Sequence, residues 1–280
     1  MSIYNARRLQ PGAAVVLGVG AALVIVMVSF LPSFSGDFHD FYMAGHLLMT
    51  GHSPYEWPRY YSPVWVAVGF APLALLPERP AYAAYTLISL GGLTVSVWRL
   101  TRGQSRALVL LTLGLLWLVQ ILAGNIDWLL PTALVVPSLA GIWLALAKPQ
   151  LGWLLVAVLL LRMPRRKAAV SVGAVAVGLG LSYLLGWNVP DLESVRLWNI
   201  APWPWGLLVG GPLAIWSLVR RDRELALGVS LLISPYWQRP SLIAAWPASM
   251  RARWLWLAWI ALMALVLIEN LSLIVGYFPR

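Results

Sequence analysis

The side chains best suited to acid–base chemistry gather in one short stretch of the chain. Residues 36–55 read GDFHDFYMAGHLLMTGHSPY and contain Asp37, Asp40 and all three histidines. A carboxyl group can act as a general base when partial burial raises its pKa toward the working pH. Two acids three residues apart share one face of a helix, so each raises the pKa of the other. Asp37 and Asp40 are therefore candidate general bases.

Two other interpretations fit the same stretch. Ser35 or Asp37 could cap a helix that lies on the outer membrane surface and ends at Gly51. A metal ion could also bind there, although the spacing of the acids and histidines matches no established ligand pattern. The ligands would be Asp37, His39, Asp40 and His46. We expect no metal and no cofactor.

The elements that must position these residues are apolar. Of the 280 residues, 60% are apolar and 11% are charged, and the mean hydropathy is +0.78. A soluble domain carries roughly 25% charged residues. Several apolar runs approach the ~20 residues that cross a bilayer core. We therefore expect an all-α, polytopic transmembrane bundle, with residues 1–280 forming a single membrane domain.

The apolar runs predict about 8–10 membrane helices, several of them short or broken at prolines. The expected ranges are 12–32, 63–77, 81–98, 106–123, 126–147 with a break, 149–162, 168–187, 202–219, 224–236 and 254–277. An interfacial helix is expected within the first external loop, residues 33–61.

The net charge of +10 does not indicate nucleic-acid binding, because the basic residues form short clusters between apolar runs. This pattern is typical of cytoplasmic loops that face anionic lipid. It predicts a multi-pass protein of the cell membrane with a cytoplasmic N terminus and an external 33–61 loop. If 63–77 and 81–98 both crossed the membrane, Arg99 would lie outside. We therefore favour an incomplete crossing by 63–77.

A longer frame runs through the first loop as Asp37-x4-Tyr42-x-Ala44-x6-Gly51-x2-Pro54-Tyr55, followed by Tyr61-x-Pro63. It resembles the first external loop of the GT-C type polyprenol-phosphate-dependent glycosyltransferases. The nearest branch contains the mycobacterial mannosyltransferases of phosphatidylinositol mannoside synthesis. The resemblance implies that Asp37 is the catalytic base, whereas Asp40 falls on a variable position.

Three shorter motifs follow in the same order as in that family. Gly124-Asn125 with Asp127 resembles a polar patch, and Lys148-Pro149 resembles a Lys-Pro pair that follows a helix. The sequence Ser-Pro-Tyr-Trp at 234–237 resembles a late Ser-Pro motif that usually has a histidine nearby. Here Gln238 and Arg239 follow instead.

The resemblance implies transfer of a sugar, with mannose favoured, from a polyprenyl phosphate to a lipid or glycan acceptor at the outer face, with inversion. No nucleotide-binding loop is present, which agrees with a lipid-linked donor. The implied donor-phosphate ligands are Lys148, Arg59 and Arg239, and the implied substrate contacts are Asp40, Tyr42, Tyr55, Tyr61, Asn125, Asp127 and Tyr236. Lys148 could instead extend to the interface, and the two arginines could be solvated loop charges. A retaining mechanism would need Asp40 or Asp127 as a second carboxylate.

Two other functions remain open at this point. The chain is shorter than usual for the family and lacks the late histidine, which fits a non-catalytic relative that serves as a subunit or scaffold of a membrane complex. Broken helices with polar residues at the break also occur in transporters. A lipid transporter is disfavoured because the polar residues gather in one external loop and no inverted repeat is visible.

Overall fold

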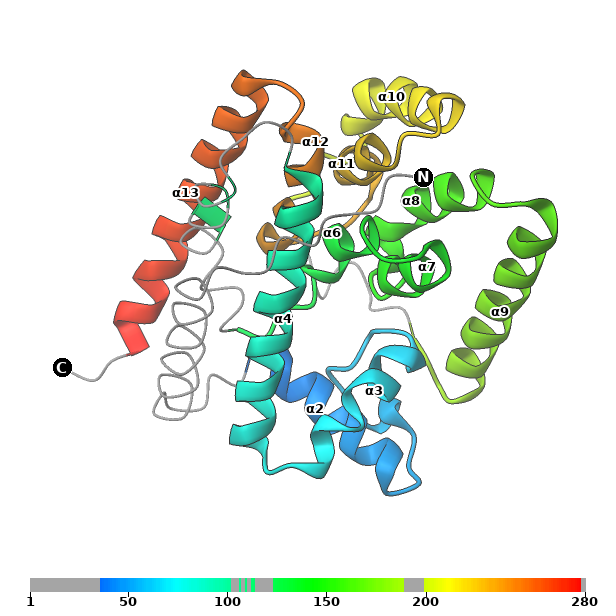
Figure 1. Ribbon diagram of the computed structural model, residues 1–280. Coiled ribbons are helices and arrows are strands. Elements are labelled where there is room, and N and C mark those ends of the chain that lie inside the picture. The colour runs from blue at the N-terminus through cyan, green and yellow to red at the C-terminus, as the bar shows by residue number, and fades with distance from the viewer. Residues whose placement is uncertain are drawn as a thin grey trace, which may run out of the picture.

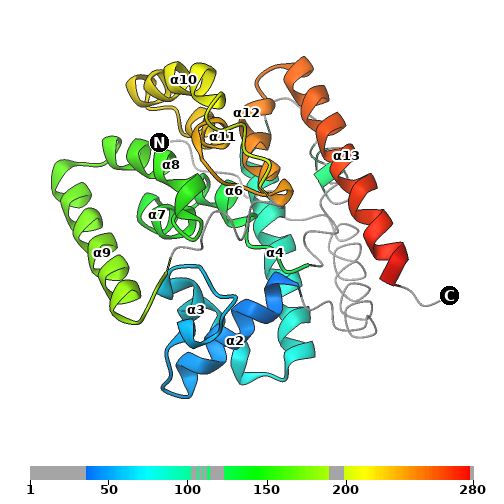
Figure 2. The same cartoon turned by 180° about the vertical axis from the view of Figure 1, so that it is seen from behind.

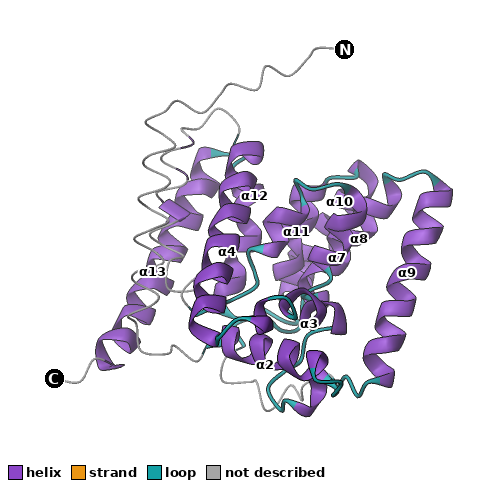
Figure 3. Cartoon of the chain, turned by 60° about the horizontal axis from the view of Figure 1, so that its bottom comes forward, coloured by secondary structure: helices purple, strands orange, loops and turns teal. Residues whose placement is uncertain are grey.

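The structure, a computed structural model, describes residues 36–101, 106, 109, 112–113, 123–188 and 199–277, and for 266, 267 and 269–277 the backbone alone. This part of the chain is helical and contains no strand (Figure 3). The predicted all-α class is therefore confirmed for the described residues. The expected helix 12–32, the N-terminal arginines and most of 106–123 lie outside them.

The α-helices of the described part follow the prolines of the sequence closely. Their bounds are α2 (Asp37–Met49), α3 (Val64–Phe70), α4 (Glu78–Leu100), α6 (Leu129–Ala133), α7 (Ser138–Ala145), α8 (Pro149–Leu161), α9 (Arg165–Leu184), α10 (Gly206–Arg220), α11 (Arg223–Ile233), α12 (Trp246–Ser249) and α13 (Arg253–Tyr277). Short 3₁₀ helices cover η1 (Pro54–Glu56), η2 (Leu73–Leu75) and η4 (Arg239–Ala245).

The two segments expected to be short or broken are so in the structure. The range 63–77 contains only the seven-residue α3 and the turn η2. Seven helical residues extend about 10 Å, well short of a bilayer core of about 30 Å. The range 126–147 is split at Pro137, which precedes the first residue of α7. Proline cannot donate a backbone hydrogen bond, so a helix ends before it or restarts after it.

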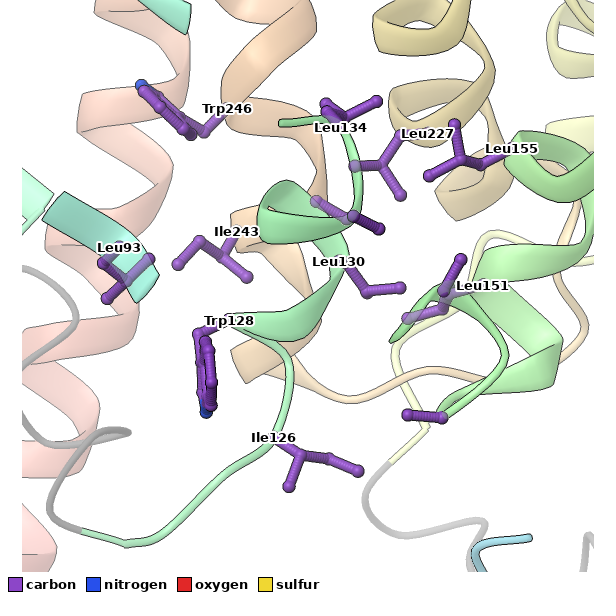
Figure 4. Packing of buried hydrophobic residues seen from close by; sticks show 14 of the residues in the cluster. Leu93, Ile126, Trp128, Leu130, Leu134, Leu151, Leu155, Leu227, Ile243 and Trp246 are labelled. Carbon is purple, nitrogen blue, oxygen red and sulfur yellow. The ribbon is translucent and has the colours of Figure 1, made fainter. Parts of the chain in front are cut away.

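The core forms around the short helix α6. Figure 4 shows Leu130 of α6 and Ile243 of η4 among side chains from α4, α8 and α11. Leu130 and Ile243 are buried, as is Trp246 at the start of α12. Because α6 is surrounded, the loop that precedes it, residues 123–128, is also fixed in the interior. That loop carries the polar patch identified in the sequence.

Helix α9 buries its small and polar side chains and exposes its apolar ones, the reverse of a helix in a soluble protein. It lies at the edge of the molecule, where its main neighbours are α3 and α8 (Figures 1 and 2). Its inward side is small and polar, with Ser171, Gly178 and Ser182 buried. Its outward side is apolar, with Val177 63% and Leu184 81% exposed. Helices in water place apolar side chains inward, whereas helices in lipid pack through small residues.

Helix α10 repeats this arrangement. Its buried residues are Gly206, Gly210, Ala214 and Ser217, and its exposed residues include Leu208, Val209, Ile215 and Val219. Among the described residues, two helices are long and apolar enough to cross a membrane, namely α4 and α9.

The folded molecule has two opposite ends, which are separated by the lengths of α4 and α9 and differ in charge. At one end Glu78, which starts α4, contacts His39 of α2, with Nδ1 and Oε1 2.7 Å apart. At the same end the backbone N–H of Val64 donates to Ser182 Oγ in the last turn of α9. At the other end Arg99 of α4 donates to the carbonyl oxygen of Val135. Helices of 23 and 20 residues span about 30–35 Å, so α2 and Arg99 lie a membrane thickness apart.

Candidate active site

Glycine holds α2 against the loop that follows residue 122. The backbone N–H of Phe38 donates to the carbonyl oxygen of Ala123 at 3.3 Å. Gly124 has φ +76°, a conformation that L side chains rarely adopt, and a Cβ there would lie 2.2 Å from the Cβ of Phe38. A Cβ at Gly36 would lie 2.5 Å from the oxygen of Ala123. The sequence predicted the Gly124 motif but not this close approach to α2.

This contact places Asp37 beside the polar patch. Asn125 Nδ2 donates to Asp37 Oδ2 at 2.9 Å. Helix α2 begins at Asp37 with Gly36 at its N-cap and no side-chain cap, so the interpretation of Asp37 as the cap is wrong, and Ser35 lies outside the described residues. Among the described residues, Asp37 Oδ1 accepts no hydrogen bond. One oxygen is thus oriented by Asn125, while the other can accept a further hydrogen bond. The predicted stop of α2 is confirmed, since Gly51 follows the helix with φ +81°.

A chain of polar contacts continues from Asp37 into the interior. Asn125 Oδ1 accepts from the backbone N–H of Asp127 at 2.8 Å. Asp127 is fully buried and pairs through Oδ1 with Lys148 Nζ at 2.6 Å. Ser241 Oγ donates to the other carboxylate oxygen, Oδ2, at 3.0 Å. Four segments that are distant in sequence therefore meet here: the start of α2, the 123–128 loop, the start of α8 and η4.

The surroundings of Asp37 favour its protonated form. Burial raises the pKa of the Asp37 carboxyl above its usual range, and the charge of Asp127 adds to this shift. The Lys148 ammonium and the hydrogen bond from Asn125 lower the same pKa and only partly offset the burial. A carboxyl group tuned in this direction has the basicity that a general base needs near neutral pH.

Lys148 lies at this junction, where the Asp127 carboxylate balances its charge. It precedes Pro149, the first residue of α8, and its side chain is 17% exposed. Its ammonium group has three N–H donors, of which the contact with Asp127 needs only one. Tyr236 lies close enough for the charges of Lys148, Asp37 and Asp127 to affect it, although burial is the main cause that raises its pKa. Gln238 Nε2 donates to its hydroxyl at 2.6 Å.

Asp40 has a separate set of partners. Its Oδ1 pairs with Arg59 at 3.0 Å and accepts from Trp57 Nε1 at 2.8 Å. Asp40 thereby ties α2 to the loop after η1, and Arg59 is engaged in the same pair. His39 turns to Glu78 instead. Within the described ranges no three His, Asp or Glu side chains gather as metal ligands.

The remaining predicted residues have partners other than Asp37 and Asn125. Tyr42 donates to the carbonyl oxygen of Leu76, and Tyr55 donates to that of Ser62. Tyr61 is exposed, and its backbone oxygen accepts from Trp187. The structure does not bring these three hydroxyl groups to the Asp37–Asn125 contact. Arg239 begins η4, two residues before Ser241, and so lies on the segment that contacts Asp127.

Two residues of the polar network were not predicted from the sequence. Ser241 follows the Ser-Pro-Tyr-Trp motif but matches no spacing that would link it to Asp127. The Tyr85 hydroxyl, within an apolar helix, donates to the backbone oxygen of Asn125 at 2.9 Å and accepts from Trp128 Nε1. A hydroxyl in an apolar helix is itself a signal for a buried polar contact, although it does not identify the partner.

No protein-family model, curated protein or solved structure matches this chain.

Proposed function

We propose that this chain is a membrane glycosyltransferase of GT-C type that moves a sugar, with mannose favoured, from a polyprenyl phosphate to a lipid or glycan acceptor. The observation that carries the proposal is the state of Asp37. One carboxylate oxygen is held by Asn125, the other is unpaired within the described residues, and the pKa of the group is raised. That combination supports a general base aimed at an incoming hydroxyl group.

The proposed reaction is a single displacement. The acceptor hydroxyl donates a hydrogen bond to Asp37 Oδ1 and attacks the anomeric carbon. The bond from that carbon to the phosphate oxygen breaks, and the polyprenyl phosphate leaves with the electron pair. The acceptor proton ends on Asp37. Attack on the face opposite the leaving phosphate inverts the anomeric configuration.

The engagement of the other carboxylates favours inversion. A retaining enzyme needs a second carboxylate about 5–5.5 Å from the first, free to attack the sugar. Asp127 is fully buried, and both of its oxygens have partners in Lys148 and Ser241. Asp40 is held by Arg59 and Trp57. Asp127 therefore offers no unpaired oxygen, and Asp40 is tied through Oδ1 to partners other than those of Asp37, which supports Asp37 as the single base.

The leaving phosphate requires donors and positive charge near Asp37. Lys148 has N–H groups beyond the one that faces Asp127, and Tyr236 carries a hydroxyl in the same neighbourhood. Arg239, on the segment of Ser241, would add a bidentate donor. These three residues form the proposed donor-phosphate site.

A lipid-linked donor requires a membrane setting, and the helix surfaces support one. Helices α9 and α10 bury small and hydroxyl-bearing residues and expose valine and leucine, as helices in lipid do. We infer a polytopic bundle in the cell membrane with the Asp37 end external and the Arg99 end cytoplasmic. The short α3 then stays on the external side, which satisfies the charge rule for Arg99.

The direct test is a transfer assay with the purified full chain in lipid nanodiscs. A panel of radiolabelled polyprenyl-phosphate sugars is offered with a membrane lipid extract as acceptor. We expect labelled product from at least one donor, with an anomeric configuration opposite to that of the donor. Folded protein that transfers no sugar from any donor would contradict the proposal.

A non-catalytic relative is the second candidate, because one observation favours it. Lys148 of the proposed donor-phosphate site already pairs with Asp127, and Arg59, which the family resemblance also implied as a phosphate ligand, pairs with Asp40. A site with balanced charge would bind an anionic phosphodiester donor weakly. Under this alternative the nanodisc assay gives no product, and the chain co-purifies in a defined ratio with other membrane proteins.

A further inference from the structure

Two cavities lie at the basic end of the molecule, a membrane thickness from Asp37. The first has a volume of about 720 Å³ and lies between the start of α7, the turn from α8 to α9, and the first turns of α9. The second, of about 620 Å³, lies along the end of α8 and the start of α9, and includes Arg221. Met163, in the turn, lines both.

The polar lining of the first cavity is positively charged. Its basic residues are Arg162, Arg166 and Lys167, and no acid is among its described lining residues. Arg162 Nη1 donates to the backbone oxygen of Arg221, which brings a further arginine to the same turn. Several cations packed without an acid repel one another, and a bound anion would relieve that repulsion.

The acids that follow Arg221 in the sequence are already engaged. Asp222 forms a short ion pair with Arg251, and Glu224 lies 3.6 Å from the same guanidinium group. Asp222 Oδ1 also accepts from the backbone N–H of Leu225 as the N-cap of α11. These two carboxylates, at the start of α11, compensate the charge of Arg251. No described contact joins them to Arg166 or Lys167.

The rest of the cavity wall is apolar and continues along α9. Leu139 and Val170 line the cavity, and both are largely exposed. Beyond them the outward side of α9 presents valine and leucine along the length of the helix. A ligand that suits this surface has a negative head for the basic rim and a long apolar chain for the side of α9.

We propose that the turn between α8 and α9 binds an anionic phospholipid of the membrane leaflet opposite to the Asp37 site. The headgroup phosphate would lie at Arg162, Arg166 and Lys167, and one acyl chain would follow Leu139 and Val170 along α9. The inference rests on the membrane setting proposed above but not on catalysis by Asp37, since binding is measured without transfer. A basic pocket between membrane helices on the cytoplasmic side is a known form of such sites.

The test measures binding of fluorescently labelled phosphatidylglycerol to the purified full chain in detergent, with labelled phosphatidylcholine as the neutral comparison. We expect saturable binding of phosphatidylglycerol alone. R166Q/K167Q should weaken it about 10- to 30-fold, the effect of about two surface charges. Both side chains are exposed, so the variant is expected to fold. The control R79Q/R253Q removes two exposed charges that line neither cavity, and it should bind phosphatidylglycerol as the wild type does.

Four results would overturn the inference. The two lipids could bind equally, or R79Q/R253Q could lose as much affinity as R166Q/K167Q, which would make the effect one of net charge. Inorganic phosphate could displace the labelled lipid completely at low millimolar concentration, which would assign the pocket to a free anion. A wild type that transfers sugar but binds no phosphatidylglycerol would refute this site alone and leave the proposed function standing.

Discussion

The carboxylates of Asp37 and Asp127 differ sharply in their surroundings. Asp127 is fully buried, and both of its oxygens are engaged, whereas Asp37 is half-buried and keeps one oxygen unpaired within the described residues. The sequence predicted Asp37, Asn125, Asp127 and Lys148 as site residues. It did not predict that Asn125 links the Asp37 carboxylate to the backbone N–H of Asp127, because a motif gives residue types and not the direction of each side chain.

Asp37 should make activity and stability respond oppositely to pH. Because its pKa is raised, the base becomes protonated at a higher pH than an ordinary aspartate, and transfer should decline early on acidification. Between the usual pKa and the raised one, the folded state binds more protons than the unfolded state. The free energy of unfolding should therefore rise as the pH falls through that window.

Transfer rates and thermal unfolding across the acid range check this prediction. The Asp37→Asn variant cannot titrate at this position and should lose this part of the pH dependence of stability. Identical dependence of unfolding on pH in the variant and the wild type would show that the pKa of Asp37 is not raised.

Asp127→Ala should destabilise the chain by about 3–5 kcal/mol, because it leaves the Lys148 charge without its partner in a largely buried site. Asp40→Ala breaks a pair whose arginine is mostly exposed, and should cost about 1 kcal/mol or less. Unfolding by denaturant in detergent measures both variants. Equal losses would mean that the Asp127–Lys148 pair is not buried as described.

At the scale of elements, the sequence predicted most of the helices and the break that matters. The helix from Asp37 to a stop at Gly51, the short segment 63–77 and the interruption of 126–147 all follow from proline, glycine and apolar run length. The docking of η4 on the 123–128 loop did not follow. It depends on the contact of Ser241 with Asp127, residues 114 positions apart, and no local periodicity encodes such a pairing.

Gly124→Ala should loosen α2 from its loop. The added methyl group would meet the Cβ of Phe38 at 2.2 Å, and φ +76° is strained for alanine. We expect a loss of at least about 1 kcal/mol in the free energy of unfolding, together with a fall in transfer. Gly91→Ala in α4 meets open space and should be neutral or stabilising by up to about 1 kcal/mol. A neutral Gly124→Ala would contradict the close approach of α2.

At the scale of the whole molecule, charge and helix length together define a direction. The acids of α2 and the start of α4 lie at one end, and Arg99, Arg162 and Arg223 lie at the other. The basic clusters of the sequence predicted this polarity. To place Arg99 at the basic end, the sequence favoured an incomplete crossing by 63–77. The seven residues of α3 and the start of α4 beside α2 agree with that prediction.

Single cysteines can test this orientation, since the chain has none of its own. His52→Cys lies after α2, and Arg253→Cys starts α13 near Arg251 at the basic end; both positions are exposed. A membrane-impermeant maleimide should label His52→Cys in intact cells and label Arg253→Cys only after permeabilisation. Labelling of both variants in intact cells would refute the proposed orientation.

The most direct test of the proposed role of Asp37 compares sugar transfer by Asp37→Asn and Asp40→Asn in the same nanodisc preparation. Asparagine keeps the size of aspartate and can still accept from Asn125, so both variants are expected to fold. Loss of a general base typically costs about 10²–10⁴-fold in rate. We predict a loss of that size for Asp37→Asn and less than about tenfold for Asp40→Asn, whose role is to hold Arg59. Wild-type transfer by Asp37→Asn would contradict the assignment of Asp37 as the base.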